Sequence, residues 1–360
     1  MAANMSKKKK IGSGHTRAHE PDGDSYAGGS ISIHHGLCIL ESWQTSRTSC
    51  VSLICIFGRT PLEECVRFVT NYKLTKEDID YIKNNLSVSC EDGFLDYLRG
   101  IDCSDVEFYA IPKGSVVFLK VPLLRIEGPI AVVQLLETPF VYLINFASLV
   151  STNAARHRFV AGKPKTLLEF GLRRAQGPDG GVGASKYSYI GGFDATSNVA
   201  AGMLFGIPLR DTHSHAFVSS FMRSNSLRGN FAETNQSELA AFTYALAFPD
   251  NFLALVDADD VMRSGIPNFC VVALALSDLG YKAIGIRLDS GDLGYLSCEI
   301  RKLFCSIEKE FGLPGFGKMN ITTSNDLNEE KLDALNKQVN SFGNCSYFAV
   351  NSSNSKCKNH

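Results

Sequence analysis

The chain lacks several features that would assign it directly to a class of protein. Its 36 Lys and Arg residues are matched by 37 Asp and Glu, which leaves a net charge of −1 over 360 residues. This balance gives no indication of nucleic-acid binding or of attraction to an anionic membrane. The eleven cysteines include no Cys-x-x-Cys pair. An odd number of scattered cysteines in a long chain argues against a disulfide framework and for reduced thiols in the cytosol.

Long uninterrupted apolar runs are also missing. The N-terminus is polar and basic, without the apolar core of a signal peptide. The longest apolar run, residues 129–150, is interrupted by Gln134, Glu137, Pro139 and Asn145. A buried helix fits this run better than a membrane span. We therefore expect a cytosolic protein that has neither a membrane nor a nucleic acid as its partner.

The first half of the chain predicts a small α+β layer. Residues 1–30 are rich in Gly, Ser, Lys and His and are expected to be disordered. Their lysine run at residues 7–10 is either a solvated tail or a nuclear signal or phosphate contact. Residues 62–88 show helical periodicity, with a capping-type start at Thr75, and residues 105–127 form short strand patterns. Residues 130–160 predict one long helix that is apolar on most faces.

The second half has a different rhythm. Four segments each run from apolar into polar or charged residues: GIPLRDTH, LALVDADD, AIGIRLDSGD and MNITTSND, which begin at residues 206, 253, 283 and 319. Helical patterns follow several of them. Strands that alternate with helices and carry reactive residues at their ends indicate a parallel α/β fold, in particular one with a barrel-type active face.

Two adjacent cations precede a glycine-rich turn. Arg173 and Arg174 could grip a phosphate or pyrophosphate, or they could form surface ion pairs. On strand geometry only one of the two would face a site. The sequence GGVG at residues 180–183 lacks the third glycine of a dinucleotide-binding turn and the surrounding βαβ unit, so we reject that interpretation.

The sequence THSHAF places His213 and His215 on one face of a strand. Three interpretations are open: a two-histidine metal site, histidines satisfied within the core, or a reactive imidazole at a strand end beside the Thr212 hydroxyl. The segment IRLDSGDL places Arg287 and Asp289 on a shared strand face. This pair could hold a phosphate together with a ribose hydroxyl or Mg²⁺, or it could be an intrachain ion pair.

One further acidic cluster, VDADD at residues 256–260, ends another strand. It could form a Mg²⁺–water site, or it could supply negative charge to the start of a helix.

Several of these segments together resemble the nicotinate phosphoribosyltransferase family. The resemblance covers residues 62–343, with a shortened stretch near 222–234, and it rests on ordered motifs: GLRRAQGPDGG, YSYIGGFDATSN, THSHAF, SGIPNFCVVALALSDLGY and IRLDSGDL. It implies an α/β fold, an irregular (β/α) barrel of the type II phosphoribosyltransferase kind, with a smaller N-terminal α/β domain and a homodimeric assembly. It also implies ligase-type synthesis of nicotinate mononucleotide from nicotinate and phosphoribosyl pyrophosphate, with ATP and Mg²⁺.

The resemblance also assigns roles to individual residues. His215 matches the histidine that ATP phosphorylates, and Thr212 and Arg287 match nicotinate contacts. By analogy with the related nicotinamide enzyme, the resemblance implies that Arg173 contacts phosphate or pyrophosphate. The remaining two positions, Asp194 and Asp289, are expected to line the base and ribose region.

The chain departs from the family pattern at several places. Asp257-Ala258-Asp259 stands where the family has Asp-Thr-Tyr, and His213 where it has an aliphatic or small residue. Two family motifs are absent: an N-terminal segment whose tyrosine stacks on the pyridine, and a Gly-Ile-Gly-Thr loop for the ribose 5-phosphate. Codons that encode residues 29–45 can read, one base later, as that missing N-terminal segment, so we expect a shifted reading frame there.

The predicted organisation follows from these departures. We expect a divergent, disordered or frame-shifted segment at 1–61, a smaller α/β domain at 62–165, a partial barrel at 166–343 and a polar non-family tail without strand pattern at 344–360. An incomplete barrel exposes sheet edges, which predicts poor solubility. Loss of the stacking tyrosine and of the ribose 5-phosphate loop predicts little or no activity. Two alternatives to nicotinate phosphoribosyltransferase activity remain. The chain could be an inactive variant that only dimerises with a full-length enzyme, or it could be an enzyme that uses nicotinamide.

Overall fold

The computed structural model describes residues 28–34, 55–56, 59–86, 91–112, 115–117, 121–221, 236–339 and 347–350. The chain forms two compact units, Met1–Thr152 with the last five residues, and Asn153–Ser355. The division falls inside one long helix, α4 (Ile130–Ala161). The domain limits expected from the sequence, with a boundary between residues 165 and 166, stay predictions.

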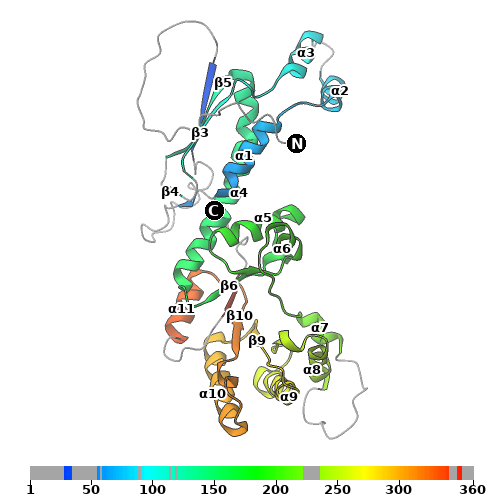
Figure 1. Cartoon of the computed structure of the whole chain (residues 1–360), viewed down its shortest axis with the longest axis vertical. Coiled ribbons are helices and arrows are strands. Elements are labelled where there is room, and N and C mark those ends of the chain that lie inside the picture. Colours follow the sequence, from blue (N-terminus) through cyan, green and yellow to red (C-terminus); the bar gives the residue numbers. More distant parts are fainter. Residues whose placement is uncertain are drawn as a thin grey trace. The chain divides into compact units, whose positions relative to one another are not determined.

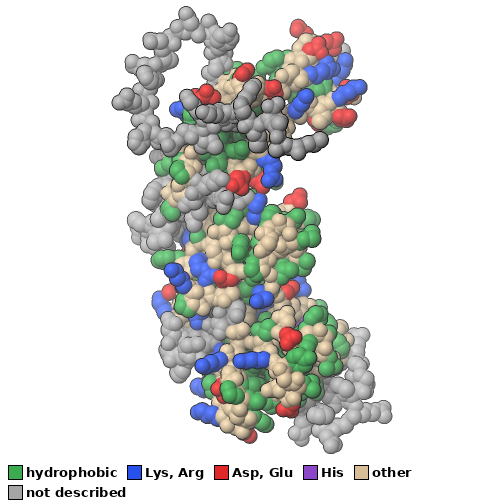
Figure 2. All heavy atoms as spheres, viewed as in Figure 1, with side chains coloured by type: hydrophobic (Ala, Val, Ile, Leu, Met, Phe, Trp, Pro, Cys, Tyr) green, Lys and Arg blue, Asp and Glu red, His purple; other side chains and the backbone are tan. Residues whose placement is uncertain are grey.

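The first unit contains an antiparallel sheet of order β1-β5-β3, made of β1 (Gly28–His34), β5 (Pro122–Pro129) and β3 (Glu107–Ala110). A second, two-stranded sheet joins β2 (Cys55–Ile56) to β4 (Val116–Val117). The helices are α1 (Arg59–Asn71), α2 (Lys76–Asn85) and α3 (Asp92–Gly100). Figure 2 shows charged side chains of both signs on α2 and α3.

Two predictions for this unit are decided by its local structure. The Thr75 hydroxyl accepts from the Asp78 amide at 3.2 Å, and the Asp78 carboxylate accepts from the Thr75 amide at 2.8 Å, which confirms the capping-type helix start. The expected disorder of residues 1–30 is wrong where β1 begins, at residues 28–30. Alternation of Ser and Ile across β1 gives the period of two that strand pairing requires. The shifted reading frame expected at residues 29–45 is not tested by strand pairing.

Helix α4 matches the long helix predicted at residues 130–160. Among the residues described, it is the one helix long and apolar enough by length and composition to cross a membrane, and 33% of its most apolar window is buried. Its first half supplies Val133, Leu136 and Phe140 to the core of the first unit. Its last turns supply Ala154 and Ala161 to the core of the second unit. Part of its apolar surface is therefore used in packing within the protein.

The second unit is built on a parallel sheet of order β7-β6-β11-β10-β9-β8, of which β6, β10 and β9 are labelled in Figure 1. Its strands are β6 (Thr166–Glu169), β7 (Ala195–Thr196), β8 (Leu253–Leu255), β9 (Gly285–Leu288), β10 (Asn320–Thr323) and β11 (Tyr347–Val350). The first and last strands of the unit are neighbours, as in a barrel. Within the described residues β7 and β8 are not paired, so the sheet is open between them, and an isolated bridge from Thr196 to Leu209 extends its β7 edge.

Helices alternate with these strands, as the sequence predicts. The α-helices are α5 (Gly177–Ile190), α6 (Val199–Phe205), α7 (His215–Ser220), α8 (Gln236–Phe242), α9 (Ile266–Asp278), α10 (Leu293–Phe311) and α11 (Glu329–Val339). Shorter helical turns are η2 (Gly171–Arg174), η3 (Thr243–Leu246), η4 (Pro249–Asn251), η5 (Val261–Gly265) and η6 (Phe316–Lys318).

One strand corrects a prediction. Residues 347–350 belong to the tail that we expected to lack a strand pattern, yet β11 pairs in parallel with both β6 and β10. The tetrapeptide Tyr-Phe-Ala-Val consists largely of residues that favour strands. It was too short, and its surroundings too polar, to stand out in the sequence. The sheet thus has a central strand where the sequence predicted a break.

The core of the second unit is rich in aromatic residues. Phe252 stacks on Phe269 at 5.4 Å between ring centroids, and Phe269 packs against Phe304 at 5.8 Å between centroids. All three are fully buried. The three rings belong to the same core cluster as Ala254 of β8 and Ile286 of β9. This packing stabilises the two strands, whose carboxyl ends carry the polar residues described next.

Candidate active site

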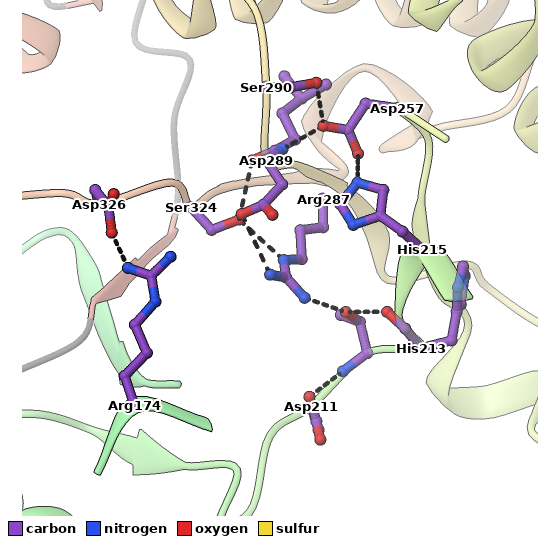
Figure 3. Close-up of polar contacts among 12 residues, drawn as sticks. Arg174, Asp211, His213, His215, Asp257, Arg287, Asp289, Ser290, Ser324 and Asp326 are labelled. Carbon is purple, nitrogen blue, oxygen red and sulfur yellow. Dashed lines mark hydrogen bonds and ion pairs between the residues drawn. The ribbon is translucent and has the colours of Figure 1, made fainter. Parts of the chain in front are cut away.

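Polar side chains from four chain segments meet at the carboxyl ends of the parallel strands (Figure 3). Asp257, Asp289 and Ser324 come just after β8, β9 and β10. Thr212 and His215 come from the segment that follows the Leu209 bridge. This is the strand-end cluster that the sequence rhythm predicts, and it brings together four of the six expected site residues: Thr212, His215, Arg287 and Asp289.

Arg287 is the centre of the cluster. Its Nε donates to Ser324 Oγ at 3.0 Å, its Nη1 to Thr212 Oγ1 at 3.1 Å and its Nη2 to Asp289 Oδ1 at 3.3 Å. Its side chain is only 16% exposed. The guanidinium carbon also lies 5.3 Å from the centroid of the Phe170 ring. A cation that is fixed on three sides beside an aromatic face is a preorganised site for a planar anion.

His215 opens α7 and is oriented by a carboxylate. Its Nε2 lies 3.2 Å from Asp257 Oδ1, and the Asp257 side chain is fully buried while that of His215 is 44% exposed. A carboxylate can only accept, so Nε2 carries a proton, and a neutral ring therefore has its lone pair on Nδ1. The geometry leaves one ring nitrogen of a partly exposed imidazole available as a nucleophile.

The second oxygen of Asp257 fixes the carboxylate itself. Asp257 Oδ2 accepts from the Asp289 amide and from Ser290 Oγ, each at 2.7 Å. Asp289 is in turn hydrogen-bonded to Ser324. The residues after β8, β9 and β10 therefore form one connected network, and the position of His215 depends on all of them.

Another acidic residue of the VDADD segment, Asp260, has a local role. Asp260 caps the turn η5 by accepting from the Met262 and Arg263 amides at 3.0 and 2.8 Å. This agrees with the interpretation of that segment as charge at a helix start. The described residues contain no group of three or more His, Cys, Asp or Glu side chains placed to hold a metal ion.

The neighbouring arginines on η2 have different environments. Arg174 is paired with Asp326, which follows β10. Arg173 forms no hydrogen bond or ion pair within the described ranges. Its charge acts on the Asp211 carboxyl, whose pKa is raised chiefly by burial and lowered in part by the Thr212 amide, Arg287 and Arg173. Of the two, Arg173 is the arginine left available to a ligand.

Asp194 is the one expected residue that the described contacts tie elsewhere. Asp194 lies just before β7 begins. Its carboxylate accepts from the Leu167 amide at 2.8 Å and pairs with Arg158 of α4. These contacts join α4 to the amino-terminal ends of β6 and β7. The expected role of Asp194 in the base and ribose region stays a prediction.

His213 does not form a metal pair with His215 among the described residues. Its Nε2 accepts from the Leu255 amide at 3.1 Å, and its ring packs 4.9 Å from that of Tyr244. Burial lowers the pKa of His213 to about 4. A cavity of about 410 Å³ lies beside it, and its lining residues are Asp211, Thr212, His213, Phe217, Tyr244, Phe248, Asn251 and Leu253.

Sequence reasoning missed three members of the site. Phe170 comes directly before the motif GLRRAQGPDGG, and nothing in the sequence distinguishes its ring from a core residue. Ser324 ends a segment whose strand-to-polar pattern was recognised, although no role was given to its hydroxyl. The sequence gives no sign that Asp257 orients His215, because the two residues are 42 positions apart.

Comparison with known proteins identifies the family. Residues 54–145 match the model for the nicotinate phosphoribosyltransferase (NAPRTase) N-terminal domain. The chain is 65% identical over 320 residues to nicotinate phosphoribosyltransferase 1 of Arabidopsis thaliana, covering 78% of this chain and 57% of that protein. It is 45% identical over 318 residues to the nicotinate phosphoribosyltransferase of Homo sapiens, covering 78% and 59%. The chain thus spans less than two thirds of the length of these relatives.

Solved structures agree. The crystal structure of human nicotinic acid phosphoribosyltransferase matches with a TM-score of 0.74 and 42% identity, over 83% of this chain and 65% of that chain. Nicotinate-nucleotide pyrophosphorylase from Pyrococcus furiosus, 24% identical, matches with a TM-score of 0.51 over 69% and 57% and shares the fold. Together with the cluster around Arg287 and His215, these matches show that the chain belongs to the nicotinate phosphoribosyltransferase family and has the type II phosphoribosyltransferase fold, here with an open sheet.

Proposed function

We propose that the chain joins nicotinate to phosphoribosyl pyrophosphate, releasing pyrophosphate and nicotinate mononucleotide, and that ATP hydrolysis is coupled to this reaction through His215. The observation that carries the proposal is the placement of a fixed guanidinium and a carboxylate-oriented imidazole at one edge of the sheet. The first suits an anionic pyridine and the second suits phosphoryl transfer.

The Arg287 site favours the acid over its amide. A carboxylate can pair with the guanidinium, whereas the neutral amide of nicotinamide gains no ion pair there. The Phe170 ring, 5.3 Å from the guanidinium carbon, offers a face on which a pyridine can stack. Thr212 Oγ1, which accepts from Arg287, lies within reach of the same carboxylate. These contacts support nicotinate as the substrate rather than nicotinamide.

The His215 site supports covalent phosphoryl transfer. In the proposed step the Nδ1 lone pair forms a bond to the γ-phosphorus of ATP, the bond to the β,γ-bridging oxygen breaks, and ADP leaves. Water later takes the phosphoryl group, which gives inorganic phosphate and restores the free ring. While it is attached, the group adds close to −2 of charge beside Arg287 and Asp257, which changes the electrostatics of the substrate site.

The sugar donor would be held by cations and by the strand-end carboxylate. Departure of pyrophosphate leaves positive character on the ribose carbon and negative charge on the leaving group. Arg173, available on η2, suits the leaving group, and Asp289 suits the ribose side. Mg²⁺ would be held by substrate phosphates and water together with one or two carboxylates, because this cation rarely uses an all-protein site.

Assembly and location are proposals as well. We infer a homodimer in the cytosol. Support for the dimer comes from exposed apolar residues on α6, where Val199, Met203 and Leu204 are 69%, 79% and 61% exposed. Light scattering coupled to gel filtration tests this, and a mass equal to one chain at micromolar concentration would count against it. The alternative of a non-catalytic chain has no described contact in its favour.

Phosphorylation of His215 tests the proposal directly. The protein is incubated with ATP labelled on the γ-phosphate and Mg²⁺, and the label is tested for loss in acid and retention in base. Asp257→Asn is expected to lower the labelling rate about 100-fold, since the imidazole loses its orienting carboxylate. His215→Ala is expected to abolish labelling. Nicotinate mononucleotide formation is measured in parallel, and an unlabelled wild-type protein that makes product would refute the coupling.

A further inference from the structure

Two side chains contact the outer edge of strand β8. Among the strands that the structure describes, β8 is the last on its side of the sheet and pairs only with β9. On the β9 side, the Ile284 amide donates to the Phe252 carbonyl, and the Val256 amide donates to the Arg287 carbonyl. Because backbone groups alternate along a strand, those of Leu253 and Leu255 face the open edge. An edge of this kind presents unpaired donors and acceptors.

Two side chains meet these edge groups. Tyr244 Oη donates to the Leu253 carbonyl at 2.5 Å, and His213 Nε2 accepts from the Leu255 amide at 3.1 Å. The two rings contact each other edge to face at 4.9 Å between centroids. Side chains therefore provide one acceptor and one donor of the kind that a neighbouring strand would supply.

The same contact fixes a segment that carries the proposed chemistry. His213 lies between Thr212, which accepts from Arg287, and His215, which contacts Asp257. No described strand lies on the outer side of β8, and the described polar contacts that join residues 211–215 to the sheet are made by side chains. Of these, the His213 contact reaches the strand backbone itself.

We propose that His213 is a positioning residue, which holds Thr212 and His215 in place by accepting the amide hydrogen of Leu255 at the open edge of β8. The catalytic part of this inference rests on the proposed function. The backbone N–H can only donate, so Nε2 must be unprotonated and the neutral ring must carry its proton on Nδ1. An aliphatic side chain at this position cannot make this contact.

The surroundings keep the ring neutral. Burial lowers the pKa of His213 to about 4, the Ser214 backbone opposes this, and the charges of Arg287 and His215 add to it. The carboxyl of Asp211 and the hydroxyl of Tyr244 are the other titratable groups that line the adjoining cavity. A neutral acceptor is therefore maintained throughout the physiological pH range.

Three variants separate this role from simple packing. His213→Gln places an amide oxygen near the Nε2 position and retains an acceptor, whereas His213→Leu fills similar space without one. His157→Leu is the matched control. It removes another buried imidazole, whose Nδ1 lies 2.6 Å from the Asn153 carbonyl within α4. Circular dichroism confirms that each variant is folded before it is compared.

Two measurements test the proposal without an assay of enzyme activity. Amide hydrogen exchange at residue 255 should accelerate about tenfold in His213→Leu, the equivalent of one lost hydrogen bond, and should remain near wild type in His213→Gln and His157→Leu. The nitrogen resonances of the His215 ring, which report its contact with Asp257, should shift in His213→Leu alone. Unchanged exchange and an unchanged His215 ring in His213→Leu, or equal effects in His213→Gln and His213→Leu, would overturn the proposal.

A third readout links the contact to phosphorylation. His215 labelling by ATP should slow about tenfold in His213→Leu with an unchanged KM for ATP, and His213→Gln should restore the rate. If the wild-type protein takes no label, the proposed function fails, while the exchange and resonance measurements still decide whether His213 positions the segment. A labelling rate that is equal in all three variants would show that the edge contact does not serve the reaction.

Discussion

At the scale of single residues, the site depends on directional contacts more than on charge alone. Arg287 has three hydrogen-bonded partners and an aromatic neighbour. Arg174 has one carboxylate partner, Asp326, and the side chains of Arg174 and Asp326 are 54% and 55% exposed. The two arginines provide a matched comparison between a preorganised guanidinium and a surface ion pair.

Replacing each arginine by lysine should separate these cases. Arg287→Lys keeps the charge but loses the planar fork, at a cost of about 2–3 kcal/mol, which corresponds to a KM for nicotinate raised roughly 30- to 150-fold. Arg174→Lys should change that KM less than about fivefold, since exposed ion pairs contribute at most about 1 kcal/mol. Steady-state kinetics with varied nicotinate measure both, and equal effects would remove the special role of Arg287.

His213 makes a prediction about acid. Its folded pKa of about 4 lies below its ordinary value of 6.5, so between these values the unfolded chain binds more protons than the folded one. The contribution of His213 to the free energy of unfolding is therefore fully present above about pH 6.5 and is lost as pH falls to about 4. Urea unfolding of wild type and His213→Gln across this window should converge towards acid pH. Parallel pH profiles would contradict the depressed pKa.

At the scale of secondary-structure elements, Gly285 permits the close pairing of β9 with β10. A Cβ at this position would lie 2.0 Å from the Asn320 carbonyl oxygen, and the φ of +151° is one that residues with a side chain rarely adopt. Arg287 lies two residues further along the same strand. The glycine is therefore a requirement of the site as well as of the sheet.

Gly285→Ala should push β9 away from β10 and lower the free energy of unfolding by about 2–4 kcal/mol. The value of kcat/KM for nicotinate should also fall in protein that is still folded, since Arg287 moves with the strand. Gly93→Ala is the control, because a Cβ at that position of α3 meets nothing within 4 Å. Thermal melts and nicotinate kinetics report the two effects, and a normal melt for Gly285→Ala would show that the strands do not pack this closely.

The elements also show how far sequence reasoning reaches. Strand ends at Asp257, Asp289 and Ser324 follow from the change from apolar to polar residues, because that change is local. The choice of Arg173 over Arg174 as the available cation depends on Asp326, which is 152 residues away in sequence. The hydrogen bond from the Leu255 amide to His213 depends on which edge of the sheet is open, and no local sequence pattern encodes the order of the strands. Distant partners and sheet order were therefore the information that the sequence lacked.

Strand β11 illustrates the same limit. Four residues, three of which favour strands, form a central strand because β6 and β10 leave a place between them. Conversely, α4 was predicted almost to the residue, because its length and apolar character are properties of one continuous segment.

At the scale of the whole molecule, two separate cores support two compact units. Phe140 is fully buried in the core of the first unit and Phe269 in that of the second. Neither core contains residues of the other. This separation predicts that damage to one core will be felt mainly in its own unit.

Phe140→Ala and Phe269→Ala test this independence. Each should destabilise its unit by about 3–5 kcal/mol through the cavity left behind. Hydrogen exchange followed by mass spectrometry should show faster exchange in β3 and β5 for Phe140→Ala, and in β8 and β9 for Phe269→Ala. Faster exchange throughout the chain in both variants would mean that the two units unfold as one.

Helix α4 has a consequence for recombination between relatives. Its first half completes one core, with Phe140, and its last turns complete the other, with Ala154 and Ala161. A chimera joined inside residues 130–161 inherits each half from a different parent, and both halves must then fit cores to which they were never matched. Viable exchanges between homologous genes should therefore have their junctions outside this helix and transfer it intact.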